Sequence, residues 1–300
     1  MNGIVSESWR VTWGHRRLIY WVFLVSLIFA WISSRGINRE ISRVLDTSLA
    51  SQDLVNGFDL SRFVELTKSP EVNFTDSTPI AVTLSFVFLV YMLFITGGVL
   101  QTYREDRRLS LGDFFEACGH NFWRFVRLML WSLIPFAIAV FVGRLVRTLG
   151  ATFASSSRAI ILSSIAGVIV TVLLVLLVRL WFDVAQVRAL SQDEHHMSRN
   201  LLRSAQITSN HLLSLFWIYF RISLLAWISL AIGAAVFINI IPPDKWWLSF
   251  LWLELIVFTQ LATRFWQRAA AVKWYQHFAE EKPELAADLT TSKPQEVVEM

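Results

Sequence analysis

Six apolar segments separated by polar ones dominate this chain. The hydrocarbon core of a bilayer is about 30 Å thick, and a helix needs roughly 20 apolar residues to cross it. The six segments have about this length, so each predicts a membrane-spanning helix. They are residues 18–33, 80–100, 125–142, 159–182, 222–241 and 246–265. The pattern predicts an all-α, polytopic membrane protein.

Composition agrees with a lipid environment. Hydrophobic residues make up 55% of the 300 residues, and 14 of them are tryptophan, which is more apolar than a soluble domain of this size. The only cysteine is Cys118, so an internal disulfide is excluded and Cys118 is interpreted as a small packing residue. The net charge of +4 does not indicate nucleic-acid binding here, because the basic residues follow the topology.

Lysine and arginine are distributed unequally between the two sides of the predicted spans. One set of segments carries 16 of the 27, the alternating set carries nine, and two lie near the C-terminus. The richer set is 1–17, 101–127, 179–221 and 264–278, and the poorer set is 34–77, 143–158 and 242–245. Because cytoplasmic loops are enriched in Lys and Arg, both termini are predicted to be cytoplasmic.

The polar segments divide the chain further. Residues 1–279 are predicted to form a single transmembrane domain, and the acidic tail 280–300 has too few large apolar groups to fold. The exported segment 34–77 is predicted to contain two amphipathic helices that form a cap, the second of them starting near Asp59. Two interpretations of this cap stay open: a structural lid, or a docking surface for an envelope protein through residues 36–68.

The cytoplasmic connections resemble one another. Ser110 can cap a helix with an apolar stripe, and a similar spacing follows Ser198. A third amphipathic stretch, residues 265–278, follows the last span. We therefore expect three weakly similar units, each a helical hairpin with a basic, amphipathic elbow helix on the cytoplasmic face.

Glu254 is the strongest candidate for a functional residue, because an ionisable group inside a span is a functional candidate by default. We expect small residues opposite it, at Gly233 and its two alanine neighbours. Two interpretations stay open: a protonated or hydrogen-bonded structural carboxyl, or a proton or cation site in a transport pathway. The possible neighbours of Glu254 in such a site are Tyr91, Thr171 and Thr259.

Other chemistry is weakly indicated. The sequence Asp193-Glu194-His195-His196 lacks a second ligand pair at helical spacing, so neither a metal nor another cofactor is predicted. A catalytic set is not visible, so an enzyme is not expected. Arginines on the cytoplasmic side can contact anionic lipid headgroups. They are Arg107, Arg108, Arg124, Arg127, Arg199 and Arg203.

Three stretches carry a resemblance to known proteins: Gly57-Phe58-Asp59, Gly97-Gly98-Val99-Leu100 and residues 114–128, which read Phe-Phe-Glu-Ala-Cys-Gly-His-Asn-Phe-Trp-Arg-Phe-Val-Arg-Leu. With them the chain resembles a family of uncharacterised bacterial integral membrane proteins. The alternation of spans with basic helices is more distantly similar to the membrane domain attached to some glycerophosphodiester phosphodiesterases. The resemblance implies a helical fold in the bacterial inner membrane, and no functional residue can be transferred from it.

These observations predict an integral inner-membrane protein, multi-pass, that acts as a non-enzymatic scaffold for protein partners or lipids. Interfacial aromatic and basic residues are abundant, whereas polar residues inside the spans are few. The alternative is a small transporter or channel that uses Glu254. Membrane lipids are the expected partners, with an envelope protein as a possible further one, and nucleic acid is not expected.

Overall fold

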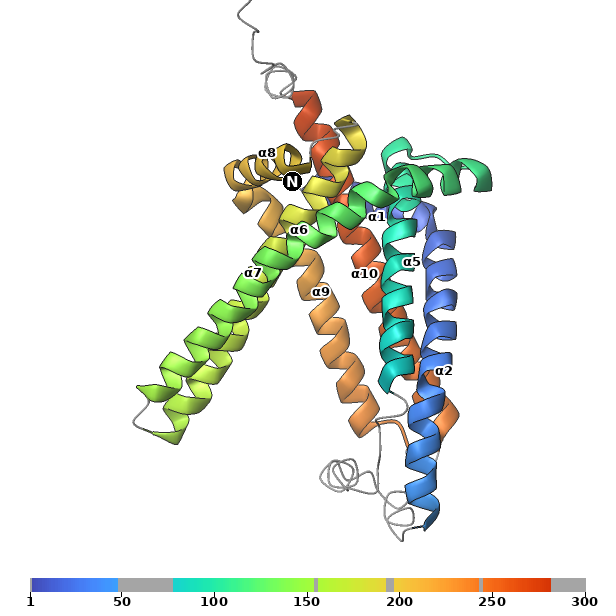
Figure 1. Cartoon of the computed structure of the whole chain (residues 1–300), viewed down its shortest axis with the longest axis vertical. Coiled ribbons are helices and arrows are strands. Elements are labelled where there is room, and N and C mark those ends of the chain that lie inside the picture. The colour runs from blue at the N-terminus through green and yellow to red at the C-terminus, as the bar shows by residue number, and fades with distance from the viewer. Residues whose placement is uncertain (1, 48–77, 154–155, 193–196, 243–244, 282–300) are drawn as a thin grey trace, which may run out of the picture. The chain divides into compact units, whose positions relative to one another are not determined.

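The computed structural model describes residues 2–47, 78–153, 156–192, 197–242 and 245–281. Within these ranges all regular structure is α-helical. The helices, shown in Figure 1, are α1 Asn2–Gly14, α2 Arg16–Thr47, α5 Thr78–Glu105, α6 Leu111–Thr152, α7 Ser157–Gln192, α8 Met197–Asn210, α9 Leu212–Asn239 and α10 Trp246–Glu281.

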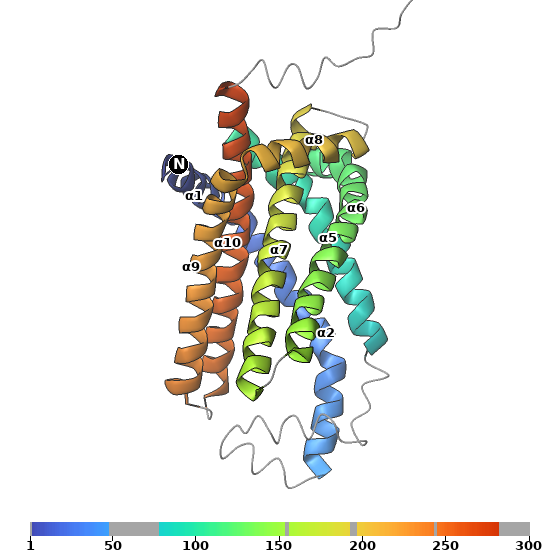
Figure 2. The same cartoon turned by 90° about the vertical axis from the view of Figure 1, so that its left-hand side faces the viewer.

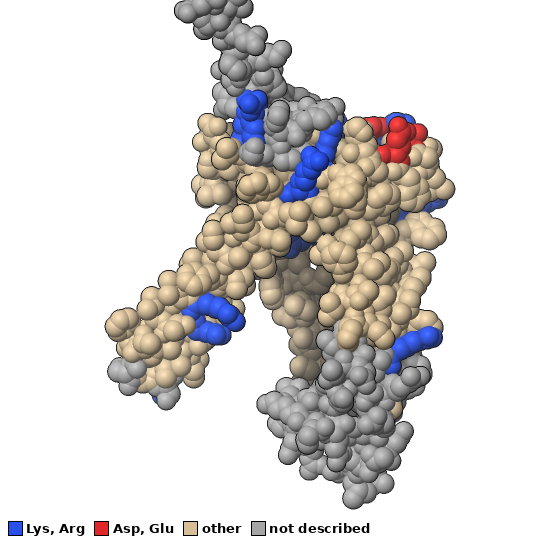
Figure 3. Space-filling model, viewed as in Figure 1, with Lys and Arg blue, Asp and Glu red and all other residues tan. Residues whose placement is uncertain are grey.

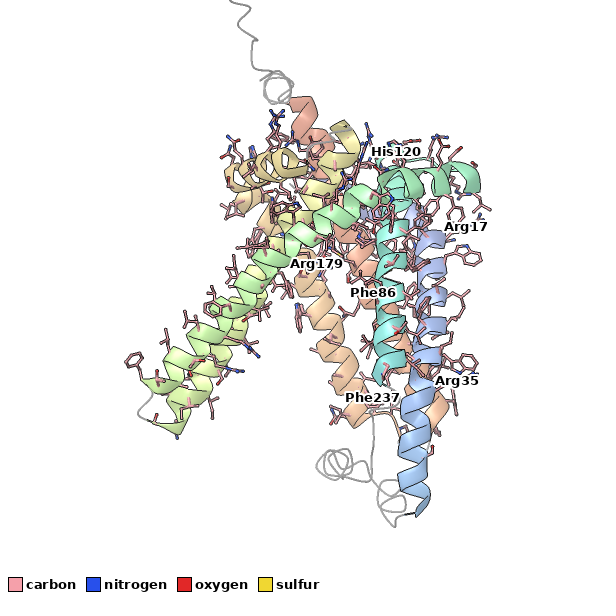
Figure 4. The ribbon with its side chains drawn as sticks, viewed as in Figure 1. Arg17, Arg35, Phe86, His120, Arg179 and Phe237 are labelled. Atoms are coloured by element: carbon pink, nitrogen blue, oxygen red, sulfur yellow. The ribbon has the colours of Figure 1, made fainter. Side chains whose placement is uncertain are left out.

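Six of the described helices are long and apolar enough to cross a membrane, which confirms the predicted spans. The qualifying stretches are Arg16–Arg35, Pro79–Glu105, Leu111–Thr152, Arg158–Ser191, Leu212–Asn239 and Trp247–Phe278. Figure 4 places Arg17 and Arg35 at the two ends of the apolar part of α2. Several of these helices are longer than a bilayer requires, so they continue beyond the apolar segments that predict them.

In α6 and α10 the extra length lies where separate elbow helices are predicted. Ser110 caps α6 as expected, accepting a hydrogen bond from the backbone N–H of Asp113 at 3.2 Å. From there α6 runs without a break through the third span to Thr152. The stretch 265–278 is not a separate amphipathic helix either, because α10 continues to Glu281 and residues 265–275 are buried on all sides.

The chain divides into two compact units. The first contains the described residues up to Trp13, those from Phe94 to Arg221 and those from Trp266 onward. The second contains residues 14–93 and 222–265 as far as they are described. Each unit combines segments that are distant in sequence, so neither can form from one continuous stretch of the chain.

Small residues set the helix contacts of the first unit. A Cβ atom on Gly97 of α5 would come within 2.7 Å of the carbonyl oxygen of Ala117 on α6, and one on Gly98 within 2.8 Å of the Cys118 sulfur. The helices α6 and α7 form a hairpin (Figures 1 and 2). A Cβ on Gly167 of α7 would approach the carbonyl oxygen of Gly143 to 2.9 Å. Small residues allow helix backbones to approach closely in membranes.

The second unit contains α2 and the transmembrane parts of α5, α9 and α10. Aromatic rings join α2 to two neighbours: Phe29 lies 5.5 Å from Phe88 of α5, and Phe23 lies 5.3 Å from Phe258 of α10 between ring centroids. The helices α9 and α10 run antiparallel next to each other in Figure 2. Trp252 of α10 donates a hydrogen bond from its indole N–H to the carbonyl oxygen of Gly233 on α9, at 2.8 Å.

Part of the sequence-based picture falls outside the described residues. The helix α2 extends to Thr47, so residues 34–47 belong to the same helix as the first span. Residues 48–77, which hold most of the predicted cap, lie outside the described part of the chain, as do residues 282–300 of the predicted tail. The cap, the tail and the single-domain organisation stay predictions.

Candidate functional site

Glu254 lies on the face of α10 that meets α2. One turn further along α10, Phe258 stacks on Tyr20 with 5.4 Å between ring centroids and meets Phe23 edge-on. Residues four apart share a helix face, so Glu254 lies on the same side as Phe258. Its side chain is half-buried.

The expected small surface at Gly233 of α9 is level with Glu254, but it contacts another face of α10. Trp252 binds the Gly233 carbonyl oxygen, and a Cβ on Gly233 would come within 2.7 Å of Ile256. Residues 252 and 256 are each two positions from Glu254, about 200° around the helix. The prediction that Glu254 faces Gly233 is therefore wrong, because a large apolar and an indole side chain occupy that contact.

Tyr91 lies near the depth of Glu254 in the second unit. Phe29 of α2 lies 6.4 Å from Tyr91 between ring centroids, and α2 runs antiparallel to both α5 and α10. The ring contacts align Glu254 with about residue 26 of α2 and Tyr91 with about residue 28, an offset of roughly 3 Å along the axis. Ser26, which sequence reasoning missed, lies at this level and donates a hydrogen bond to the Phe23 carbonyl oxygen at 2.7 Å.

The two threonines proposed as neighbours of Glu254 bind their own helices. Thr259 donates to the Leu255 carbonyl oxygen at 2.8 Å and lies about 140° around α10 from Glu254. Thr171 belongs to the first unit, where it packs against Gly143 and donates to the Gly167 carbonyl oxygen at 2.7 Å. These contacts explain both hydroxyls as satisfied groups in helix packing, and their grouping with Glu254 stays a prediction.

A second polar side chain of α10 faces α9 and was also missed. Gln260 donates from Nε2 to the Ala226 carbonyl oxygen at 2.8 Å and lies 3.4 Å from the Ser229 hydroxyl. With the Trp252 contact, it forms a series of hydrogen bonds along the α9–α10 hairpin. Such bonds between helices stabilise packing in the membrane.

The first unit contains a buried polar interior that begins where α1 meets α10. The indole N–H of Trp266 donates to the Ser8 hydroxyl at 3.0 Å and to the Val5 carbonyl oxygen at 3.2 Å. One turn along α1, Thr12 lies beside Tyr103 of α5, which in turn lies close enough to Arg268 of α10 for an electrostatic interaction. These contacts hold the N-terminal helix against two spans.

Charged groups continue the α1–α10 contact. A carboxylate oxygen of Glu7 lies 3.6 Å from Lys273 Nζ, and the other lies 3.1 Å from His277 Nε2. The hydrogen bond to His277, and then the positive charge of Lys273, lower the pKa of Glu7 below its ordinary value although partial burial opposes the shift. Lys273 also lies 3.9 Å from Asp106 in the turn between α5 and α6.

The end of α7 that is predicted to lie on the cytoplasmic side is buried by other segments of the chain. Residues 183–190 are buried on every side. Asp183 accepts a hydrogen bond from the Tyr219 hydroxyl of α9 at 2.9 Å, and Asn200 of α8 donates to the Ala185 carbonyl oxygen at 3.2 Å. Arg188 is completely buried. Each of these contacts joins two helices, so the polar groups act as connections within the unit.

Sequence reasoning missed this interior for an identifiable reason. The polar residues lie before or after the apolar segments that define the spans, so the sequence pattern places them in polar connections. A usable signal was the regular mixture of polar and small residues in 183–190 (Asp-Val-Ala-Gln-Val-Arg-Ala-Leu) without a turn residue. That pattern continues the helix, but whether other segments cover it depends on tertiary contacts.

The six candidate arginines for lipid contact lie in three places of the first unit. Arg107 and Arg108 are exposed in the turn between α5 and α6, and Arg107 pairs with Glu105. Arg124 and Arg127 lie on α6, and Arg199 and Arg203 lie on α8. Figure 3 shows basic side chains near the α8 end of the unit and again along the far part of the α6–α7 hairpin, with mostly uncharged surface between.

Within the described ranges there is no group of three His, Cys, Asp or Glu side chains that could hold a metal ion. The Asp193–His196 sequence lies outside those ranges. Neither a family model, nor a curated protein, nor a solved structure matches this chain. The helices and their length define the class to which it belongs: multi-pass α-helical membrane proteins.

Proposed function

We propose that this protein is a non-enzymatic scaffold of the bacterial inner membrane that organises lipids or protein partners. The observation that carries the proposal is the use of the buried polar groups in the first unit. The bonds of Trp266 to Ser8, of Tyr219 to Asp183 and of Asn200 to α7 each connect two helices. Groups used in this way stabilise a fixed surface.

The orientation follows from the positive-inside tendency, with both termini in the cytoplasm. In this orientation the first part of α6 and α8 lie on the cytoplasmic side and act as two of the three predicted elbow segments. The helix α1 lies on the same side of the membrane. The resemblance to bacterial integral membrane proteins supports the inner membrane as the location. The exported cap, at residues 34–77, is a second surface for an envelope partner, through residues 36–68.

Photo-crosslinking in native membranes tests the scaffold. A crosslinking amino acid replaces Phe115 of α6 or Leu202 of α8, both exposed, and a matched control replaces Leu225, exposed in the middle of α9. Further probes at Arg43 and Arg62 test the exported segment. We expect one reproducible protein or lipid adduct at the probe positions and only bulk lipid at Leu225. Identical adducts at all positions would contradict a scaffold.

A second candidate function is transport of a proton or small cation through the second unit. It is favoured by the level that Glu254 shares with Tyr91 and Ser26, on three different helices. A carboxyl inside a membrane span can bind and release a proton or cation.

Flux into liposomes separates the two functions. We expect a transporter to lose flux in Glu254→Gln while the protein stays folded. The control Thr263→Val, about 13 Å further along α10, where the hydroxyl binds the Gln260 carbonyl oxygen of its own helix, should retain flux. Equal flux in wild type, Glu254→Gln and empty liposomes would exclude transport by this route.

A further inference from the structure

The helix α8 leaves one large apolar side chain outside the packed unit. Its buried face contains Asn200, Ser204 and Thr208 together with Leu201 and Ile207, whereas Leu202 is 74% exposed. Just after α8, Leu213 is 82% exposed. A helix that faces water buries its large apolar residues and exposes its polar ones. Leu202 and Leu213 depart from this pattern and are suited to an apolar medium beside the polar residues that surround them.

The first part of α6 also exposes large apolar residues. Cys118 and Asn121 are buried against α5, whereas Leu111 is 79% exposed and Trp123 is 67% exposed. Phe115 is exposed between them. Since α6 continues without a break into the third span, this surface is continuous with the surface that the span presents to lipid.

The helix α1 repeats the arrangement of α8. Ser8 and Thr12 are buried in α1 as Ser204 and Thr208 are in α8. Ser204 follows Ser8 by 196 positions, and Thr208 follows Thr12 by the same number. The correspondence continues into the following spans: Ile19 and Val22 of α2 match Leu215 and Ile218 of α9 at the same separation, and all four are buried. At the edge of the contact with α10, Trp9 lies 4.8 Å from Trp266 and stacks on Trp13 at 5.4 Å between ring centroids, and both Trp9 and Trp13 are partly exposed.

Cations accompany these outward apolar residues. Arg199 and Arg203 lie three positions before and one position after Leu202, and Arg10 follows Trp9 directly. Arg199 shares a helix face with Leu202, whereas Arg10 and Arg203 lie about 100° around their helices from Trp9 and Leu202. Arginines that flank exposed leucine and tryptophan are typical of helices that lie in the headgroup region of a bilayer. Charge complementarity then selects anionic phospholipids.

We infer that the outward faces of α1, α8 and residues 111–127 of α6 dock on the anionic headgroups of the same membrane that the six spans cross. We name these segments the docking helices. This inference rests on the proposed function, and it specifies anionic phospholipid as the ligand. Apolar side chains enter the boundary of the acyl chains, and the arginines bind the phosphates.

Charge-removing variants test the headgroup contact. In full-length protein, Arg199→Gln with Arg203→Gln removes both cations of α8, and native mass spectrometry compares retained phosphatidylglycerol with phosphatidylcholine. Each arginine contributes roughly fivefold, so we expect a loss of about 25-fold in this preference. The control Lys282→Gln with Lys293→Gln removes two cations that follow α10 in sequence and leaves the preference unchanged. An unchanged preference in the α8 variant would overturn the inference.

A depth measurement tests the same docking without removing charge. Leu202→Cys is labelled with an environment-sensitive fluorophore in nanodiscs, and the parent protein, whose Cys118 is buried, measures background labelling. We expect quenching by nitroxide-labelled lipids and protection from iodide. Quenching by iodide alone would place α8 in water, and quenching by neither agent would place it beneath a protein partner. Either result would overturn lipid docking, whereas the crosslinking experiment decides the scaffold itself.

Discussion

Replacing Gly97 with alanine separates packing from helix propensity. A Cβ at this position would come within 2.7 Å of the Ala117 carbonyl oxygen and 3.2 Å of the Cys118 Cα, both backbone atoms that cannot rotate away. Gly119, on the exposed side of α6, has no heavy atom within 4 Å of the same added carbon. Gly119→Ala is therefore a matched control.

The two variants share the gain in helix propensity and differ in the cost of packing the added carbon. Alanine in place of glycine favours a helix by about 1 kcal/mol at either position. Forcing an extra carbon into a close-packed contact costs about 1–3 kcal/mol. We expect Gly119→Ala to raise the free energy of unfolding by about 1 kcal/mol. The free energy of unfolding of Gly97→Ala should be lower than that of Gly119→Ala by about 1–3 kcal/mol.

Two assays report the result. Tryptophan fluorescence in mixed micelles follows unfolding as denaturant rises, and a thiol reagent measures access to Cys118, the only cysteine of the chain. Since Cys118 packs against α5 at Gly98, a loosened α5–α6 contact in Gly97→Ala should increase its labelling rate. Equal stability and equal labelling in the two variants would refute the close approach of α5 and α6.

Three further variants test other contacts with the same unfolding assay. Glu7→Gln removes the carboxylate 3.6 Å from Lys273, and because the pair is partly exposed it lowers the free energy of unfolding by only about 0.5 kcal/mol at neutral pH. The folded contacts lower the Glu7 pKa from 4.5, so its contribution is present above that value and is lost as pH falls through the lower folded pKa; the variant should therefore show a flatter acid dependence. Tyr219→Phe removes the 2.9 Å hydrogen bond to buried Asp183 and should cost about 1.5–3 kcal/mol, with no change contradicting the contact. Ser110→Ala should cost about 1 kcal/mol through loss of the α6 N-cap, and Ser110→Asp should restore most of it.

The Glu254 region shows how far sequence reasoning reaches into a membrane site. The level of Glu254 along the α9–α10 hairpin was predictable, because residue counts from the turn place Gly233 opposite it along the axis, and the Trp252 bond to Gly233 agrees. The direction of the side chain was not predictable. It depends on which neighbours occupy each face of α10, and Phe258 directs this face to α2.

The sequence by itself determined the number of spans and the position of each along the chain. Their apolar length is a property of single segments, because a helix satisfies its own backbone hydrogen bonds in a bilayer whatever its neighbours are. The N-cap at Ser110 was predictable for the same reason, since the serine side chain binds a backbone N–H only three residues away.

Only the tertiary structure decided which polar residues are buried. Ser8 meets Trp266 across more than 250 positions of the chain, and Tyr219 meets Asp183 across 36. The same serine or aspartate would be a solvated residue if the partner helix lay elsewhere. Burial depends on the segments that cover a side chain, and a local pattern contains no information about segments so distant in sequence.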